Sequence, residues 1–112
     1  MPAYVPDRSE IIWIDFDPQA GREQAKRRPA LVLSPRIYNA KTNLLICCPI
    51  TSAVKGYPFE VAVDSAKMAG VVLSDQVKSL DWKVRKAAKI ERASDAVMVE
   101  VMAKVCALLQ LN

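Results

Sequence analysis

The chain has 112 residues, of which 52% are hydrophobic and 25% are charged, and its formal net charge is +4. This length and composition are typical of one soluble globular domain, and no apolar run approaches the roughly 18 residues of a membrane-spanning helix. The chain contains no histidine, which excludes a Ser-His-Asp triad, a Cys-His pair and a His-rich metal site. Acid–base chemistry would have to use carboxylates, lysine, cysteine, tyrosine or an arginine in an unusual environment.

The N-terminus and the cysteines indicate the compartment. The first ten residues, MPAYVPDRSE, contain neither a basic region nor an apolar stretch, so we expect no signal peptide and a cytoplasmic protein. The three cysteines, Cys47, Cys48 and Cys106, are odd in number and two are adjacent, which makes a poor disulfide framework. We expect them to be small buried side chains, and we expect residues 1–112 to form a single domain.

The hydrophobic pattern predicts five short strands. Residues 10–17 are rich in β-branched and aromatic side chains, and alternation places Ile12, Ile14 and Phe16 on one face. A polar loop follows at residues 18–28. The remaining strands are expected at residues 29–34, 44–50, 58–63 and 70–80, with a turn at 38–43 and a change to polar character at Ser74.

The C-terminal segment has a different period. Within residues 94–110, Val97, Val101, Val105 and Leu108 recur at helical spacing, with Met98, Met102 and Leu109 on the adjoining row. Ser94 is a good N-cap for this helix. We expect this apolar stripe to face the core. Five strands and a closing helix predict a mainly β fold built on a compact, strongly curved sheet or small barrel.

Positive charge is concentrated in two segments. Residues 22–41 contain six cations and one acid, and residues 78–92 contain six cations and two acids. Such segments indicate a polyanionic partner, with nucleic acid first among the candidates, although a solvated face would have the same composition.

Polar side chains stand at the ends of predicted strands, where a core strand does not need them. They are Asp15 and Asp17 with Glu23 and Arg28 in the adjoining loop, then Thr51 and Ser52, and then Asp75, Gln76, Lys78 and Ser79. If these ends converge, the site suits RNA cleavage by internal transfer, because an arginine fork and neutral donors stabilise the charge that develops when the ribose 2′-OH attacks phosphorus. RNA supplies its own nucleophile, and no carboxylate cluster has metal-ligand spacing, so we expect neither a metal nor another cofactor.

Three stretches of the sequence carry a resemblance to a known family. They are YVPDRSEIIWIDFDPQAGREQAKRRPALVLSP (4–35), CPITSAVKGYPFEV (48–61) and GVVLSDQVKSLDW (70–82). Together they resemble the MazF/PemK toxins, the endoribonucleases of type II toxin–antitoxin modules. The resemblance implies a small twisted SH3-like barrel closed by a C-terminal helix and assembled as a homodimer. It also implies sequence-specific, metal-independent cleavage of single-stranded RNA that leaves a 2′,3′-cyclic phosphate and a 5′-hydroxyl.

The same resemblance assigns roles to individual residues. The family's catalytic arginine falls on Arg28, its threonine on Thr51, and its loop glutamate on Glu23, a candidate base or orienting group. The residues implied to contact RNA are Asp17, Lys26, Arg27, Lys55, Asp75, Gln76, Lys78 and Ser79. Among these, Gln76 is the implied base reader, and Lys55 and Lys78 would hold the RNA backbone.

A MazE-like antitoxin is the implied protein partner. Its acidic, largely disordered tail would fold along the basic groove and block the site. Without it, cleavage of messenger RNA would arrest translation and growth. Two other interpretations stay open: a relative of the same fold that poisons DNA gyrase without cleaving RNA, and an RNA-binding module without catalysis. The set of Glu23, Arg28 and Thr51 favours the enzyme.

Overall fold

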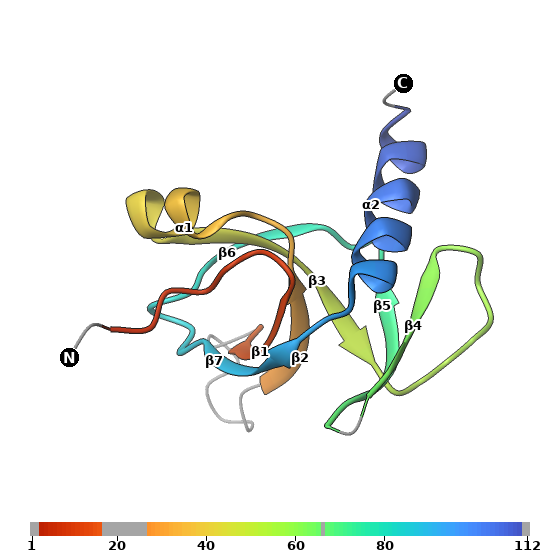
Figure 1. Cartoon of the computed structure of the whole chain (residues 1–112), viewed down its shortest axis with the longest axis horizontal. Coiled ribbons are helices and arrows are strands. Elements are labelled where there is room, and N and C mark those ends of the chain that lie inside the picture. The colour runs from red at the N-terminus through yellow and green to blue at the C-terminus, as the bar shows by residue number, and fades with distance from the viewer. Residues whose placement is uncertain (1–2, 17–26, 66, 111–112) are drawn as a thin grey trace.

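The computed structural model describes residues 3–16, 27–65 and 67–110. This part of the chain is a curled antiparallel sheet with two helices (Figure 1). The strands are β1 (Glu10–Asp15), β2 (Arg27–Val32), β3 (Leu44–Thr51), β4 (Glu60–Asp64), β5 (Ala69–Leu73), β6 (Lys78–Asp81) and β7 (Ala88–Arg92). The helices are α1 (Arg36–Thr42) and α2 (Asp95–Leu109). The expected mainly β fold with a curved sheet and a C-terminal helix is confirmed.

β3 is the centre of the sheet and has three neighbours. The strand order is β4-β5-β3-β2-β1-β7, and β6 also pairs with β3. Residues 44–47 of β3 pair with β6, whereas Ile50 and Thr51 pair with β5. β5 and β6 therefore pair with the same side of β3 and diverge from each other. Residues 74–77, which connect them, lie at the point of divergence.

The sheet buries apolar side chains on both of its faces. One group, here called the strand cluster, consists of Ile12, Ile14, Ala30, Val32, Leu45, Cys47, Leu80 and Trp82. A second group, here called the helix cluster, packs against α2 and includes Ile11, Leu31, Cys48 and Val101. Successive side chains of a strand point to opposite faces, so the adjacent residues Cys47 and Cys48 are both buried but belong to different clusters. This explains why β2 and β3 are nearly continuous apolar runs in the sequence.

α2 covers the helix cluster with only part of its length. The helix begins after Ser94, whose Oγ accepts the amide of Val97 at 3.2 Å and satisfies a free N-terminal donor. Met98, Val101 and Val105 are buried, as the periodicity predicts. For Leu108 and Leu109 the expectation of a core-facing position is wrong: they are 52% and 62% exposed, because the C-terminal end of α2 extends past the sheet (Figure 1). Within the described residues, no helix has the length and apolar character needed to span a bilayer.

Two carboxylates tie the segment before β1 to the start of α1. Glu10 is 2% exposed and lies 3.5 Å from Nη2 of Arg36 and 3.7 Å from Nζ of Lys89. Asp7 accepts the backbone amide of Arg36 at 2.9 Å. Desolvation raises the pKa of Asp7, but the amides of Arg36 and Arg8 and the Arg36 charge outweigh it, so this pKa lies below its ordinary value. The N-terminal segment is therefore held by charge-assisted hydrogen bonds.

Several local predictions are wrong. Residues 36–42 form α1 rather than a turn, because Asn39 is fully buried and its amide donates to the carbonyl of Pro6 at 2.9 Å. The expected strand at 70–80 is two strands, β5 and β6, and β7 adds a further strand that was not predicted. Cys106 is half-buried, in contrast to the two buried cysteines of β3.

Candidate active site

One face of the sheet changes from apolar to polar at the end of three strands, beside the aromatic ring that follows a fourth. On each of these strands, the residue two positions beyond an inward-facing one lies on the same face. These residues are Phe16 after Ile14, Arg28 before Ala30, Thr51 after Pro49 and Lys78 before Leu80. Paired strands keep their alternation in phase, so all four side chains lie just beyond the strand cluster. They open into a pocket of about 210 Å³, here called the strand-end site and lined by Phe16, Arg28, Pro49, Thr51, Leu73, Gln76 and Lys78.

Arg28 and Thr51 lie on neighbouring strands at the centre of the strand-end site. Ala30 pairs with Pro49 between β2 and β3, and the same register two residues further on brings Arg28 opposite Thr51. β2 begins at Arg27, two residues earlier than predicted. Arg28 is therefore part of a strand, paired with Ile14 of β1, although its side chain is exposed. A paired backbone fixes the origin of this guanidinium far better than a loop would.

The hydroxyl of Thr51 is oriented by its own backbone. Its Oγ1 accepts the amide of Ala53 at 3.1 Å, so that one lone pair is occupied and the hydroxyl proton is free to donate to a ligand. β5 approaches the end of β3 closely here. A Cβ on Gly70, whose φ is +150°, would lie 2.5 Å from the carbonyl oxygen of Thr51. Only glycine permits this approach without displacement of the backbone.

Two further pockets flank the strand-end site. The aromatic pocket, of about 180 Å³, is lined by Thr51, Ala53, Lys55, Tyr57, Phe59, Glu60, Leu73 and Gln76. The methionine pocket, of about 220 Å³, is lined by Arg28, Pro29, Ile50, Thr51, Ser52, Met68 and Ala69. Thr51 lines all three pockets, and Arg28 lines two of them. An extended ligand that contacts Thr51 with its middle can therefore occupy the surface on both sides.

Arg85 holds the end of β1 against the rest of the sheet. Its Nη1 donates to the carbonyls of Asp15 and Phe16 at 3.0 and 2.6 Å, and its own carbonyl accepts the amide of Asp15 at 3.0 Å. These bonds fix the backbone that presents Phe16 to the strand-end site. Part of the second basic segment therefore has a structural role.

The cysteine nearest to the strand-end site is not a reactive group. Cys47 pairs with Lys78 on the same face, but burial, with a smaller contribution from Cys48, raises the pKa of its thiol to about 12. Because a thiol rather than a thiolate is present at neutral pH, Cys47 acts there as neither a base nor a nucleophile. Across the described ranges, no group of three or more cysteine or acidic side chains converges in a way that could hold a metal ion.

The structure brings some of the predicted site residues together. Arg28, Thr51, Gln76 and Lys78 line the strand-end site, and Lys55 lines the aromatic pocket beside it. Asp17, Glu23 and Lys26 lie outside the described residues.

Three other predicted RNA contacts lie away from these pockets. Arg27 points to the opposite face of β2, where it forms a 3.0 Å ion pair with Asp15 and donates to the carbonyl of Lys86 at 2.8 Å. Ser79 pairs with Ile46 on that same opposite face, and Asp75 is exposed but lines none of the three pockets. Their contact with RNA stays a prediction.

Sequence reasoning did not identify the apolar walls of the site. Phe16 was expected on the same face as Ile12 and Ile14, and it does lie there, but its place beside Arg28 was not predicted. The signal was available in the alternation of β1, since a residue two positions beyond a buried one stays on the same face. Tyr57 and Phe59 of the aromatic pocket were also missed as site residues.

The fold is a small, curled β-protein, and its strand-end site has an arginine, a lysine and an oriented hydroxyl beside three adjoining pockets. These side chains are of the kinds that bind phosphate. Residues 7–109 match the family model described as PemK-like, MazF-like toxin of type II toxin–antitoxin system. The chain belongs to this family.

Individual relatives agree with this assignment. The endoribonuclease toxin MazF of Escherichia coli K12 is 55% identical over 86 residues, which cover 77% of this chain and 78% of the relative. The crystal structure of MazF from Deinococcus radiodurans superimposes with a TM-score of 0.89 at 49% identity, covering 97% of this chain and all of the other. A MazE–MazF crystal structure from the same organism gives a TM-score of 0.88 at 44% identity, covering 98% of this chain and all of the matched chain.

Proposed function

We propose that this protein is a toxin endoribonuclease that cleaves single-stranded messenger RNA at a short sequence motif in the cytoplasm, without a metal ion. The observation that carries the proposal is the juxtaposition of Arg28 and Thr51 where three pockets meet. Relatives that are named endoribonucleases support it, including one that is 55% identical.

The reaction that suits this arrangement is internal transfer. The ribose 2′-oxygen attacks the adjacent phosphorus, a bond to phosphorus forms, and the bond to the 5′-oxygen of the next nucleotide breaks. The products are a 2′,3′-cyclic phosphate and a 5′-hydroxyl. Arg28 supplies a positively charged fork, carried on a paired strand, to the non-bridging oxygens, whose charge increases as the phosphorane forms. The hydroxyl of Thr51, already oriented by Ala53, donates to one of the same oxygens.

Proton transfer needs a base for the 2′-OH and an acid for the leaving oxygen. Glu23 is the proposed base or orienting group by the family resemblance, and it lies outside the described residues. Arg28 is proposed to assist this proton transfer in addition to binding phosphate. Cys47 is not available as the base, because its thiol pKa of about 12 keeps it protonated. It is not available as the acid either, because its side chain is fully buried.

The proposed protein partner is an antitoxin with an acidic tail. A peptide rich in carboxylates complements Arg28, Lys55 and Lys78, which lie exposed along the joined pockets, and would exclude RNA from them. The MazE–MazF complex among the similar structures supports such a partner.

A homodimer is the proposed assembly, and its support is an apolar groove on the other side of the sheet. This groove, of about 540 Å³, is lined by Arg8, Leu33, Ser34, Pro35, Tyr38, Ile46, Val77, Met102, Val105, Cys106 and Leu109. Contiguous apolar surface that is open to solvent is typical of an interface. We propose that a second copy of the chain covers it.

The experiment for the enzyme is cleavage of a long single-stranded RNA by the purified protein in excess EDTA, with the new 5′ ends mapped. We expect cuts at one recurrent short motif with 5′-hydroxyl ends. Intact RNA with tight binding would instead identify an RNA-binding module, and intact RNA with inhibition of gyrase would identify a gyrase poison. Cleavage that requires added Mg²⁺ would contradict the metal-independent mechanism.

A further inference from the structure

A pair of aromatic side chains lies beside the strand-end site, in a surface loop outside the two buried clusters. Tyr57 and Phe59 lie in the connection between β3 and β4 and stack with ring centroids 5.2 Å apart and planes inclined by 23°. Tyr57 is 51% exposed, and Phe59 is half-buried. Both rings line the aromatic pocket, whose other wall includes Thr51 and Gln76.

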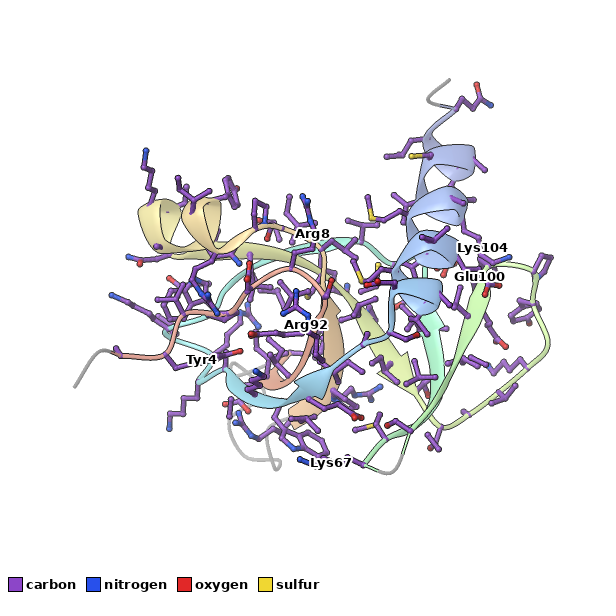
Figure 2. All side chains as sticks on the ribbon, viewed as in Figure 1. Tyr4, Arg8, Lys67, Arg92, Glu100 and Lys104 are labelled. Atoms are coloured by element: carbon purple, nitrogen blue, oxygen red, sulfur yellow. The ribbon has the colours of Figure 1, made fainter. Side chains whose placement is uncertain are left out.

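The backbone that carries these rings is held at three successive carbonyls. The carbonyl of Tyr57 accepts the amide of Glu60 at 3.1 Å, and that of Phe59 accepts the amide of Ser74 at 3.3 Å. Between them, the carbonyl of Pro58 accepts Nζ of Lys104 at 2.7 Å. Figure 2 shows Lys104 on the side of α2 that faces this loop. The rings are therefore presented on a rigid support, which reduces the entropy lost when a ligand binds.

The one carboxylate among the residues lining the aromatic pocket is already occupied. Glu60 accepts the amides of Lys55 and Gly56 at 3.2 and 3.0 Å. Gly56 has a φ of +81°, which suits glycine at the turn that these two bonds close. Two amide donors and the nearby Lys55 offset the negative charge, so the pocket does not repel an anionic strand.

From these contacts we infer that the aromatic pocket is a nucleobase subsite, which takes the base next to the cleaved phosphate by stacking it on Tyr57 and contacting its edge with Gln76. The inference rests on the proposed function for the position of the phosphate at Thr51. Thr51 lines both the aromatic pocket and the strand-end site, so a nucleotide whose phosphate contacts its hydroxyl has its base within reach of the rings. Proteins that bind single-stranded RNA commonly stack unpaired bases on aromatic side chains. Lys55 lies at the rim, where it can pair with a phosphate.

The test uses the full-length protein and three variants at one loop. Tyr57→Leu removes the aromatic face but keeps apolar bulk, and Tyr57→Trp restores a face. Val54→Ala is the matched control, because Val54 is 61% exposed in the same loop and does not line the pocket. Affinity is measured by fluorescence anisotropy with a single-stranded oligonucleotide that lacks 2′-hydroxyls, and cleavage is measured separately as kcat and KM on RNA. Thermal unfolding confirms that each variant is folded.

We expect Tyr57→Leu to weaken binding about tenfold or more, mainly through KM, while Tyr57→Trp and Val54→Ala stay near the wild type. Equal affinity of Tyr57→Leu and the wild type would overturn the nucleobase subsite. If the wild type still cleaves RNA in that case, the proposed endoribonuclease activity is unaffected. If Tyr57→Leu binds more weakly but the wild type cleaves no RNA, the nucleobase subsite is supported and the endoribonuclease activity is contradicted. If Tyr57→Leu loses affinity only for an acidic peptide and not for the oligonucleotide, the pocket belongs to a protein partner and the inference is wrong.

Discussion

The strand-end site and the apolar groove share β3 and the segment leading into β6 but have opposite chemistry. β3 places Thr51 in the strand-end site and Ile46 in the apolar groove. β6 and the residues before it place Gln76 and Lys78 in the site, and Val77 between them in the groove. Since neighbouring residues of a strand point to opposite faces, one short segment serves both surfaces.

This difference separates two requirements of the proposed function. Cations at the strand-end site are exposed where a polyanion can pair with them, and no apolar partner is needed to cover them. The groove, in contrast, leaves Met102 37% exposed and Leu109 62% exposed, and such surface is stabilised when a partner removes it from water. Chemistry and assembly are therefore expected to respond to different substitutions.

The largest expected effect is the loss of cleavage on Arg28→Ala. Removing a preorganised group that stabilises transition-state charge reduces kcat by about 10²–10³-fold, and more where it also assists proton transfer. Sedimentation of the variant should match the wild type, because Arg28 does not line the apolar groove. Arg27→Ala is the matched control: its side chain points to the other face, and we expect only mildly weaker RNA binding with reduced salt dependence. Near wild-type cleavage by Arg28→Ala would show that another arginine performs the chemistry.

The next effect concerns the groove. Met102→Glu places a charge where a second copy would bury the side chain, and we expect the dimer dissociation constant to rise at least about tenfold, corresponding to roughly 1.4 kcal/mol or more. Val99 is 70% exposed and does not line the groove, so Val99→Glu should leave the dissociation constant unchanged. Sedimentation velocity at micromolar concentration measures both. Equal association of Met102→Glu and the wild type would exclude this groove as the interface.

A smaller effect is expected where β5 approaches the end of β3. Gly70→Ala introduces a Cβ 2.5 Å from the Thr51 carbonyl oxygen, and we expect a loss of about 1–2 kcal/mol of unfolding free energy and a several-fold lower kcat. Gly56→Ala has positive φ but open space around its Cβ, so it should lose stability, about 1 kcal/mol, without moving Thr51. Urea unfolding and cleavage assays distinguish the two. An unchanged kcat in Gly70→Ala would contradict the expectation that cleavage depends on the exact position of Thr51.

The smallest effect is expected at Asp7, which lines neither the strand-end site nor the apolar groove. The folded-state pKa of Asp7 is lowered, so its contribution to stability is complete above the unfolded pKa and is lost as pH falls through the folded pKa. Asp7→Asn should therefore be less stable than the wild type by about 0.5 kcal/mol at pH 7, with the difference vanishing near pH 2. Urea unfolding at the two pH values measures this. A difference that persists at low pH would contradict the charge-based account of this contact.

The core strands were predictable because their hydrophobic pattern is local. Ile12 and Ile14 share a face as alternation requires, and β2 and β3 are apolar because both their faces are buried. α1, β6 and β7 were not predicted as elements. Asn39 in α1 is a turn-forming residue in sequence statistics, yet here its amide and its carbonyl are satisfied by Pro6 and by Nε1 of Trp82. Such contacts join distant segments and leave no local signal.

The candidate site was predictable in part for the same reason. Arg28, Thr51 and Gln76 could be named from strand ends and family resemblance, and register then brings them to one pocket. Arg27 could not be separated from Arg28 by charge, since the two differ only in the face to which they point. Tyr57 was not named because its proposed role depends on how the loop is held by α2, which sequence spacing does not reveal.

The proposed mechanism requires the RNA's own 2′-OH to attack a phosphate that is held at Arg28 and Thr51. The most direct measurement replaces the single 2′-OH at the mapped cut with hydrogen in a short RNA and follows the products by mass spectrometry in EDTA. We expect the all-ribose strand to give a 2′,3′-cyclic phosphate and a 5′-hydroxyl, and the substituted strand to bind equally well but remain uncut. Cleavage of the substituted strand, or a 5′-phosphate product, would contradict the account.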